Sequence, residues 1–327
     1  MMHKSFGLAL FSLLLCLGTG GVQAAEAYPA QPIEMVVGYS AGGPTDVTAR
    51  IIAKELTESL GKPVVVSNKT GSASLIATKE IMKAKPDGYT LLFASLGHNV
   101  NPIISPKLAD YDPIKDFEPI SLVATQPLVV VTAYDSKFKT LKDIVEQAKR
   151  DPDSVSFGSA GVGGSAHLAG ELLALSAGVK MLHVPFRGNA PALTEVSAGR
   201  VSFMFYPSIG ISEQVDAKRV RVLAVGPSSG LSQFPNVPTM ASLGYQGFDD
   251  AAPWVGMLAP KGTSADIVAR LNAEVEKILG KAAVRDRLES LGNVVVGGSP
   301  KVFVDYLRKN TETMKEVVAK ADIKMPE

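Results

Sequence analysis

The sequence predicts an α/β protein of two lobes, each built on a largely parallel sheet flanked by helices. Short apolar segments alternate with segments of helical periodicity between residues 33 and 320, a pattern typical of strand and helix repeats. Two such series occur, and the apolar stretch between them, 117–133, contains Pro119 and Pro127. A chain of 327 residues is also too long for one ordinary core, so two domains are expected.

The first series predicts three strands separated by two helices. In the first helix, Val47, Ile51, Leu56 and Leu60 recur at intervals of four or five residues and lie along one face. Strands are expected at 33–39, 64–67 and 90–94, and helices at 45–60 and 75–83.

The second series continues the same pattern to the end of the chain. Strands are expected at 128–132, 155–158, 181–184, 201–205, 220–225 and 254–258, and helices at 141–150, 166–177, 265–279 and 300–320. Because the strand at 254–258 returns to the first series, we assign residues 28–125 plus 252–327 to lobe 1 and residues 126–251 to lobe 2. Two chain crossings then leave a cleft between the lobes, which is a favoured ligand site.

Residues 1–27 have the features of a cleavable export signal. Lys4 precedes an apolar run, 6–17, and the triplets 22–24 (V-Q-A) and 25–27 (A-E-A) both fit a small-x-small cleavage pattern. The run is too short to span a bilayer, which takes roughly 20 residues. Cleavage removes Cys16, the one cysteine, so we expect a mature protein with neither disulfides nor a thiol nucleophile.

The charge balance excludes several classes of partner. Lys and Arg number 33 against 32 Asp and Glu, which gives a net charge of +1, and 46% of the residues are hydrophobic. Nucleic-acid or anionic-membrane binding needs a clustered basic surface, which this sequence lacks. The same composition excludes general disorder.

Two glycine-rich loops, each between a predicted strand and helix, carry the main functional signal. They are Y-S-A-G-G-P-T-D, residues 39–46, and F-G-S-A-G-V-G-G-S-A-H-L-A-G, residues 157–170. The unpaired N–H groups and the dipole at a helix N-terminus favour an anion. Hydrogen bonds to a charged group contribute about 1.5–3 kcal/mol each. Two such loops converging on one carboxylate can therefore supply the roughly 8 kcal/mol of a micromolar complex.

A series of short motifs runs in order through the whole mature chain. They are Y-P-A-Q-P-I from Tyr28, the first glycine loop, K-P-D-G-Y-T-L-L from Lys85, Y-D-P-I-K-D-F-E-P-I-S-L-V-A from Tyr111, the second glycine loop, H-V-P-F-R-G from His183, N-V-P-T from Asn236, L-A-P-K-G-T from Leu258 and L-N-A-E-V from Leu271. This succession resembles the Bug-type periplasmic substrate-binding proteins of tripartite tricarboxylate transporters. The resemblance implies a type II periplasmic-binding-protein fold that closes by a hinge, captures a small organic acid and delivers it to a membrane permease. It also implies a monomeric, non-enzymatic protein without metal or cofactor.

The resemblance further implies that the two loops hold the ligand carboxylate, largely through backbone groups, small side chains and ordered water. Ser40 and Ser165 can donate hydroxyl hydrogens, and Tyr39 is expected to form an apolar wall. Asp46 is favoured as a helix cap, because a carboxylate near the site would repel an anionic ligand. The residues carried over are Tyr39, Ser40, Ala41, Gly42, Thr45 and Asp46 in lobe 1, and Ala160, Gly161, Ser165 and His167 in lobe 2.

Three further residues are candidates at the cleft. Tyr206 stands where many relatives have an acidic residue, and a phenol cannot pair with a cation as a carboxylate does. We therefore expect simple or aromatic carboxylates and not amino acids. His98 follows the third predicted strand, while Arg187 could reach an outer ligand carboxylate or remain a solvated charge. The segment 67–74 also departs from the family's usual proline- and glycine-rich version.

Two alternative functions remain open from the sequence. A secreted hydrolase could use Ser165 with a nearby histidine, although the stretch G-G-S-A-H at 163–167 lacks the G-x-S-x-G pattern. A sensor that presents the ligand to a membrane kinase would use the same pocket. The histidines have no metal-binding spacing, and the glycines at 161–164 do not have the spacing of a dinucleotide site.

Overall fold

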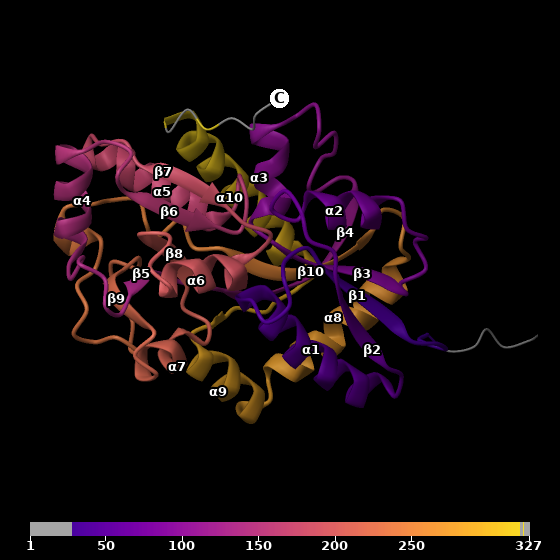
Figure 1. Ribbon diagram of the computed structural model, residues 1–327. Helices are drawn as coiled ribbons and strands as arrows, with labels where there is room; N and C mark the ends of the chain where they lie inside the picture. The colour runs from indigo at the N-terminus through magenta and orange to yellow at the C-terminus, as the bar shows by residue number, and fades with distance from the viewer. Residues whose placement is uncertain (1–27, 321–322, 324–327) are drawn as a thin grey trace, which may run out of the picture.

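The computed structural model describes residues 28–320 and residue 323, so the expected export signal lies outside the described residues. Two sheets, each covered by helices on both faces, form two lobes that lie side by side (Figure 1). The predicted fold class is confirmed, and the two sheets are mixed in direction. Within the described ranges, no helix has both the length and the apolar character needed to cross a membrane.

The sheet of lobe 1 has the order β11-β4-β10-β3-β1-β2. Its pairings show that β1 to β4 run in one direction, whereas β10 and β11 run in the other. The reversed strand β10 lies between β3 and β4 and brings the end of the chain back into the first sheet. The strands are β1 (Ile33–Val37), β2 (Val64–Asn68), β3 (Thr90–Ser95), β4 (Phe117–Thr125), β10 (Trp254–Pro260) and β11 (Val294–Val295).

The sheet of lobe 2 has the order β7-β6-β8-β5-β9. Four of its strands share one direction, and β5 alone is antiparallel to its neighbours β8 and β9. The strands are β5 (Leu128–Ala133), β6 (Ser156–Ser159), β7 (Leu182–Pro185), β8 (Phe203–Pro207) and β9 (Val220–Val225).

Helices cover both faces of each sheet (Figure 1). In lobe 1, α1 and α8 pack on one face of the sheet, and α2, α3 and α10 pack on the other. In lobe 2, α4 and α5 lie on one face, and α6 and α7 lie on the other. The helices are α1 (Pro44–Leu60), α2 (Leu75–Met82), α3 (Gly97–Ile104), α4 (Leu141–Arg150), α5 (Ser165–Ala177), α6 (Asn189–Ser197), α7 (Ile211–Asp216), α8 (Ala265–Leu279), α9 (Ala282–Leu291) and α10 (Pro300–Lys320), with a short 3₁₀ turn at Ala241–Leu243.

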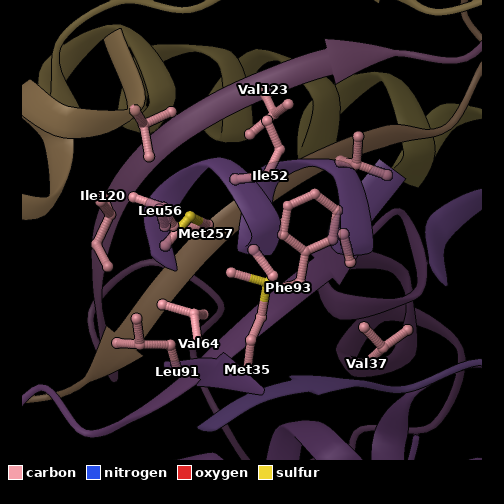
Figure 2. Packing of buried hydrophobic residues seen from close by; sticks show 14 of the residues in the cluster. Met35, Val37, Ile52, Leu56, Val64, Leu91, Phe93, Ile120, Val123 and Met257 are labelled. Carbon is pink, nitrogen blue, oxygen red and sulfur yellow. The ribbon is translucent and has the colours of Figure 1, made fainter. Parts of the chain in front are cut away.

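The core of lobe 1 follows directly from the sequence periodicity. Ile52 and Leu56 of α1 point at the sheet and contact Met35, Phe93 and Met257, all fully buried (Figure 2). Burying one such side chain contributes about 1.5–3 kcal/mol. This packing fixes the start of α1, and with it the first glycine loop, against the end of β1.

Several elements differ from the sequence prediction. The stretch 117–133 contains one strand that was not predicted, β4, which residues 126–127 join to the expected strand β5. Helices α3, α6, α7 and α9 were not predicted; each has ten residues or fewer, and α3 contains Pro102. These short helices matter for function because two of them begin at the interlobe cleft.

Candidate ligand-binding site

A small cavity lies between the lobes at the carboxyl ends of strands from both sheets, the usual ligand position in open α/β sheets. It contains about 270 Å³ of space not occupied by atoms. All of the side chains around it are uncharged. The lining residues are Tyr39, Thr45, Ser95, Leu96, Gln126, Ala160, Gly164, Ser165, Asn189, Pro207 and Pro253.

Four helices begin at this cavity. Thr45 lies in the first turn of α1, Ser165 and Asn189 are the first residues of α5 and α6, and Leu96 precedes α3. The first N–H groups of each helix have no partner within the helix, and each N-terminus carries a partial positive charge of roughly half an elementary unit. The cavity therefore provides hydrogen-bond donors and positive potential from two lobes without any cationic side chain.

The first glycine loop is held in place by Asp46. Its Oδ2 accepts from Gly42 N at 2.9 Å and from Arg50 Nε at 2.8 Å, and its Oδ1 accepts from Asn68 Nδ2 at 2.8 Å. Burial alone would raise the pKa of Asp46, but these donors together hold it below its usual value. With both oxygens occupied, Asp46 positions the loop and does not line the cavity.

The second glycine loop is held by two stacked histidines, His167 and His183, whose ring centroids lie 3.9 Å apart. His167 Nδ1 accepts from Gly163 N at 3.2 Å, so the ring hydrogen is on Nε2, 3.6 Å from Glu171 Oε1. His183 Nε2 is 2.6 Å from Ser159 Oγ, which also accepts from Gly161 N. Burial, with a contribution from His167, lowers the pKa of His183 to about 3, which keeps the ring neutral. Both histidines therefore hold the second glycine loop in place, His167 directly and His183 through Ser159.

The two lobes are in contact around the cavity. Ser40 lies against Gly188, where an added Cβ would be 2.7 Å from Ser40 Cβ and 2.8 Å from Ser40 N. At the mouth, an added Cβ on Gly161 would be 3.0 Å from Ala73 N. Residues 72–74 all have positive φ, between 44° and 78°, which non-glycine residues rarely adopt. The described conformation is therefore a closed one with little clearance.

A buried polar network joins the lobes at the first chain crossing. Gln126 Nε2 donates to Thr48 Oγ1 at 3.1 Å and to Asn293 Oδ1 at 3.2 Å. Thr48 belongs to α1 and Asn293 follows α9, so the crossing is tied to two helices of lobe 1. Beside it, Ser208 Oγ donates to Gly292 O at 3.0 Å, which adds a contact from lobe 2.

The structure separates the expected first-loop residues into three groups. Tyr39 and Thr45 line the cavity, whereas Ser40 lies against Gly188 and has a buried Oγ without a partner among the described residues. Ala41 and Gly42 are exposed at the tip of the loop. In the second loop, Ala160 and Ser165 line the cavity, Gly161 lies at the mouth, and His167 lies beneath the loop.

The three remaining candidates do not line the cavity. His98 is fully buried in lobe 1 against Tyr111, Phe117 and Trp254, and its Nε2 is 2.8 Å from Pro113 O. Its pKa falls to about 4 because burial disfavours the charged ring.

Tyr206 is buried in the core of lobe 2, since alternation along β8 directs it toward α6, and burial raises its pKa. Arg187 is exposed at the mouth beside Phe186 and Gly161. The expectation that Tyr206 selects the ligand therefore has no support from its position.

Sequence reasoning missed seven cavity residues. Gly164 lay within the second glycine loop, and G-N-A-P at 188–191 carried a signal for a helix start that could have identified Asn189. The others depend on long-range packing, and no local pattern marks them. The missed residues are Ser95, Leu96, Gln126, Gly164, Asn189, Pro207 and Pro253, of which only Gly164 was inside a predicted loop.

A larger surface groove, with about 1680 Å³ of space not occupied by atoms, lies at the opposite end of lobe 2. Residues at the amino ends of β6, β8 and β9 line it, and it is broadly open. The smaller interlobe cavity is the better candidate for a ligand site, because enclosure and converging helix ends favour a small ligand. Within residues 28–320, no group of three or more potential ligands forms a metal site.

Comparison with known proteins decides the family. The family model described as the tripartite tricarboxylate transporter family receptor matches residues 48–323. The chain belongs to this family. The receptor is 39% identical over 312 residues to a protein encoded in the tcbD-tcbE intergenic region of Pseudomonas sp. strain P51, covering 95% of this chain and 92% of that protein. It is 34% identical to the protein BugT of Bordetella pertussis, covering 94% and 96%.

Solved structures agree with this assignment. The periplasmic binding protein BugD superposes on the receptor with a TM-score of 0.86 at 32% identity, covering 91% of this chain and 99% of that chain. MatC of Rhodopseudomonas palustris, solved with bound malate, gives 0.83 at 30% identity, covering 89% and 100%. An R. palustris protein solved with adipate gives 0.87 at 29% identity, covering 91% and 99%. The receptor thus has the two-lobed fold of periplasmic solute-binding proteins.

Proposed function

We propose that this receptor binds a small organic acid between its lobes in the periplasm and delivers it to the permease of a tripartite transporter. The observation that carries the proposal is the convergence of four helix N-termini on one uncharged cavity. Such an arrangement favours a carboxylate, whose oxygens accept from free N–H groups. The related structures with malate and adipate support the same ligand class.

The lobes act as two rigid bodies, residues 28–125 plus 252–327 and residues 126–251, which rotate about the crossings. The ligand binds the open form and stabilises the closed form, because it contacts loops from both lobes only after closure. Release of the export signal, residues 1–27, and action as a monomer are further parts of the proposal.

The site lacks the features of a hydrolase. His167 uses its Nδ1 on Gly163, and His183 bonds to Ser159, so among the described residues neither histidine is hydrogen-bonded to Ser165. A serine without a base is a weak nucleophile. We therefore assign Ser165 to ligand binding and not to catalysis.

The test is a thermal-shift screen of the mature protein, from about residue 26, against mono-, di-, tri- and aromatic carboxylates, amino acids and esters. A saturable rise in Tm with an acid, without product, supports the receptor, because a ligand that binds only the native state raises its stability. Formation of a product by the wild-type protein but not by Ser165→Ala would show that the protein is a hydrolase and not a receptor. Absence of any carboxylate hit would remove the ligand class.

A further inference from the structure

Gln126 lies at the first chain crossing, and its neighbours fix the orientation of its amide. Asn293 Nδ2 donates to Leu288 O at 3.2 Å, so Asn293 must present its Oδ1 to Gln126. A rotated Gln126 amide would set its oxygen 3.2 Å from that Oδ1 and 3.5 Å from Pro44 O, two acceptors facing an acceptor. The Nε2 group of Gln126 therefore faces the hinge.

The other amide atom, Gln126 Oε1, is buried and has no partner among the described residues. Gln126 has no exposed surface and lines the ligand cavity. Buried acceptors are nearly always paired, because an unpaired one has lost its water without replacement. Because Gln126 lines this cavity, a ligand held there can bring a donor to it.

We infer that Gln126 Oε1 accepts a hydrogen bond from a hydroxyl group of the ligand, which makes the receptor selective for hydroxycarboxylates. This inference rests on the proposed function. An ionised carboxylate can accept hydrogen bonds from the N–H groups at the helix ends, but it has no hydrogen to donate to Gln126 Oε1. A second group on the ligand must supply the donor.

A hydroxyl fits better than an ammonium group. The lining residues include no Asp or Glu, and the four helix N-termini place partial positive charge around the same space. An ammonium group would be buried there without a carboxylate of the protein to pair with, which is unfavourable. Asn189, also in the lining, has an Oδ1 without a partner among the described residues and adds a second neutral acceptor.

The experiment compares matched acids by isothermal titration calorimetry: lactate with propionate, malate with succinate, and 3-hydroxybutyrate with butyrate. In the wild-type protein, the hydroxy acid of the binding pair is expected to bind about 10- to 100-fold more tightly. Alanine, the ammonium counterpart of lactate, is expected to bind more weakly than lactate. Equal affinity within every pair would overturn the inference, since an ordered water would then satisfy Gln126.

Two variants locate the effect. Gln126→Met removes the acceptor at similar size, and the ratio of the two affinities is expected to fall below about threefold. Thr48→Val removes a hinge partner of Nε2 and leaves Oε1, so it is expected to change both affinities equally and preserve the ratio. A ratio that persists in Gln126→Met would assign the hydroxyl to another acceptor and refute the inference. If no acid binds the wild-type protein, the proposed function fails first; if acids bind without preference, only the inference fails.

Discussion

Replacing Gly188 with alanine tests whether ligand binding requires the closed contact between the lobes. The new Cβ would lie 2.7 Å from Ser40 Cβ and 2.8 Å from Ser40 N, whereas carbon atoms normally touch at about 3.5–4.0 Å. The lobes must therefore separate by about 1 Å at this point. Ser40 N is a backbone atom, so a rotamer change cannot remove the clash.

Overpacking of this size costs about 1–3 kcal/mol. Because the clash exists only in the closed form, the whole cost appears in binding, and we expect Kd to rise about 5- to 150-fold. The assay is isothermal titration calorimetry with the acid identified by the screen, together with a thermal melt of the unliganded protein. The φ of +146° at Gly188 also strains alanine in both forms, and that part lowers Tm without changing Kd.

Gly199→Ala is the matched control. Gly199 is in the same lobe with φ of +71°, and an added Cβ there meets no atom within 4 Å. It is expected to lose about 1 kcal/mol of stability from left-handed strain and to keep its affinity. Unchanged affinity in Gly188→Ala, with the control also unchanged, would refute the closed contact as the bound state.

Three other predictions concern the loop, the core and pH. Gly161→Val is expected to abolish measurable binding while the circular dichroism spectrum stays native, because its Cβ would press on Ala73 N of the other lobe; normal affinity would remove the second loop from the site. Tyr206→Asp is expected to lower the free energy of unfolding, measured in urea, by about 3 kcal/mol or more, since it puts a carboxyl group into the core of lobe 2. The control Tyr206→Phe is expected to change this free energy by no more than about 1 kcal/mol. An Asp variant of normal stability would contradict the buried position. His98 has a pKa of about 4 in the folded protein and about 6.5 in the unfolded chain, so its contribution to the free energy of unfolding is complete above pH 6.5 and is lost as pH falls toward 4. His98→Asn is therefore expected to reduce the slope of the unfolding free energy against pH between these values by about 1.4 kcal/mol per pH unit. An unchanged slope in urea titrations would contradict this prediction.

Most strands and the longer helices could be predicted from the sequence, whereas four of the helices with ten residues or fewer could not. Helix α1 has 17 residues with a clear apolar face, and its expected range differs from the structure by one residue. Helix α6 has nine residues, many of them small, so its periodicity carries little information. Its position at the cleft comes from packing against β5, β6 and β8.

The candidate site shows the same division. Tyr39, Thr45, Ala160 and Ser165 belong to the two predicted strand-loop-helix segments, so that pattern was enough to bring them to the cavity. Local pattern could not place His98, because the rotation of α3 decides which of its side chains enter the core. Gln126 was equally hidden, since its role depends on Asn293, 167 residues later in the chain.

The convergence of helix N-termini makes the energy of the closed form depend on whether an anion is bound. Partial positive charges that meet across the cleft repel one another, and an anion between them turns that repulsion into attraction from both sides. A bound anion then favours closure of the lobes. A permease that recognises only the closed form would seldom be occupied by empty receptors. Empty receptors would then compete little with loaded ones for the transporter.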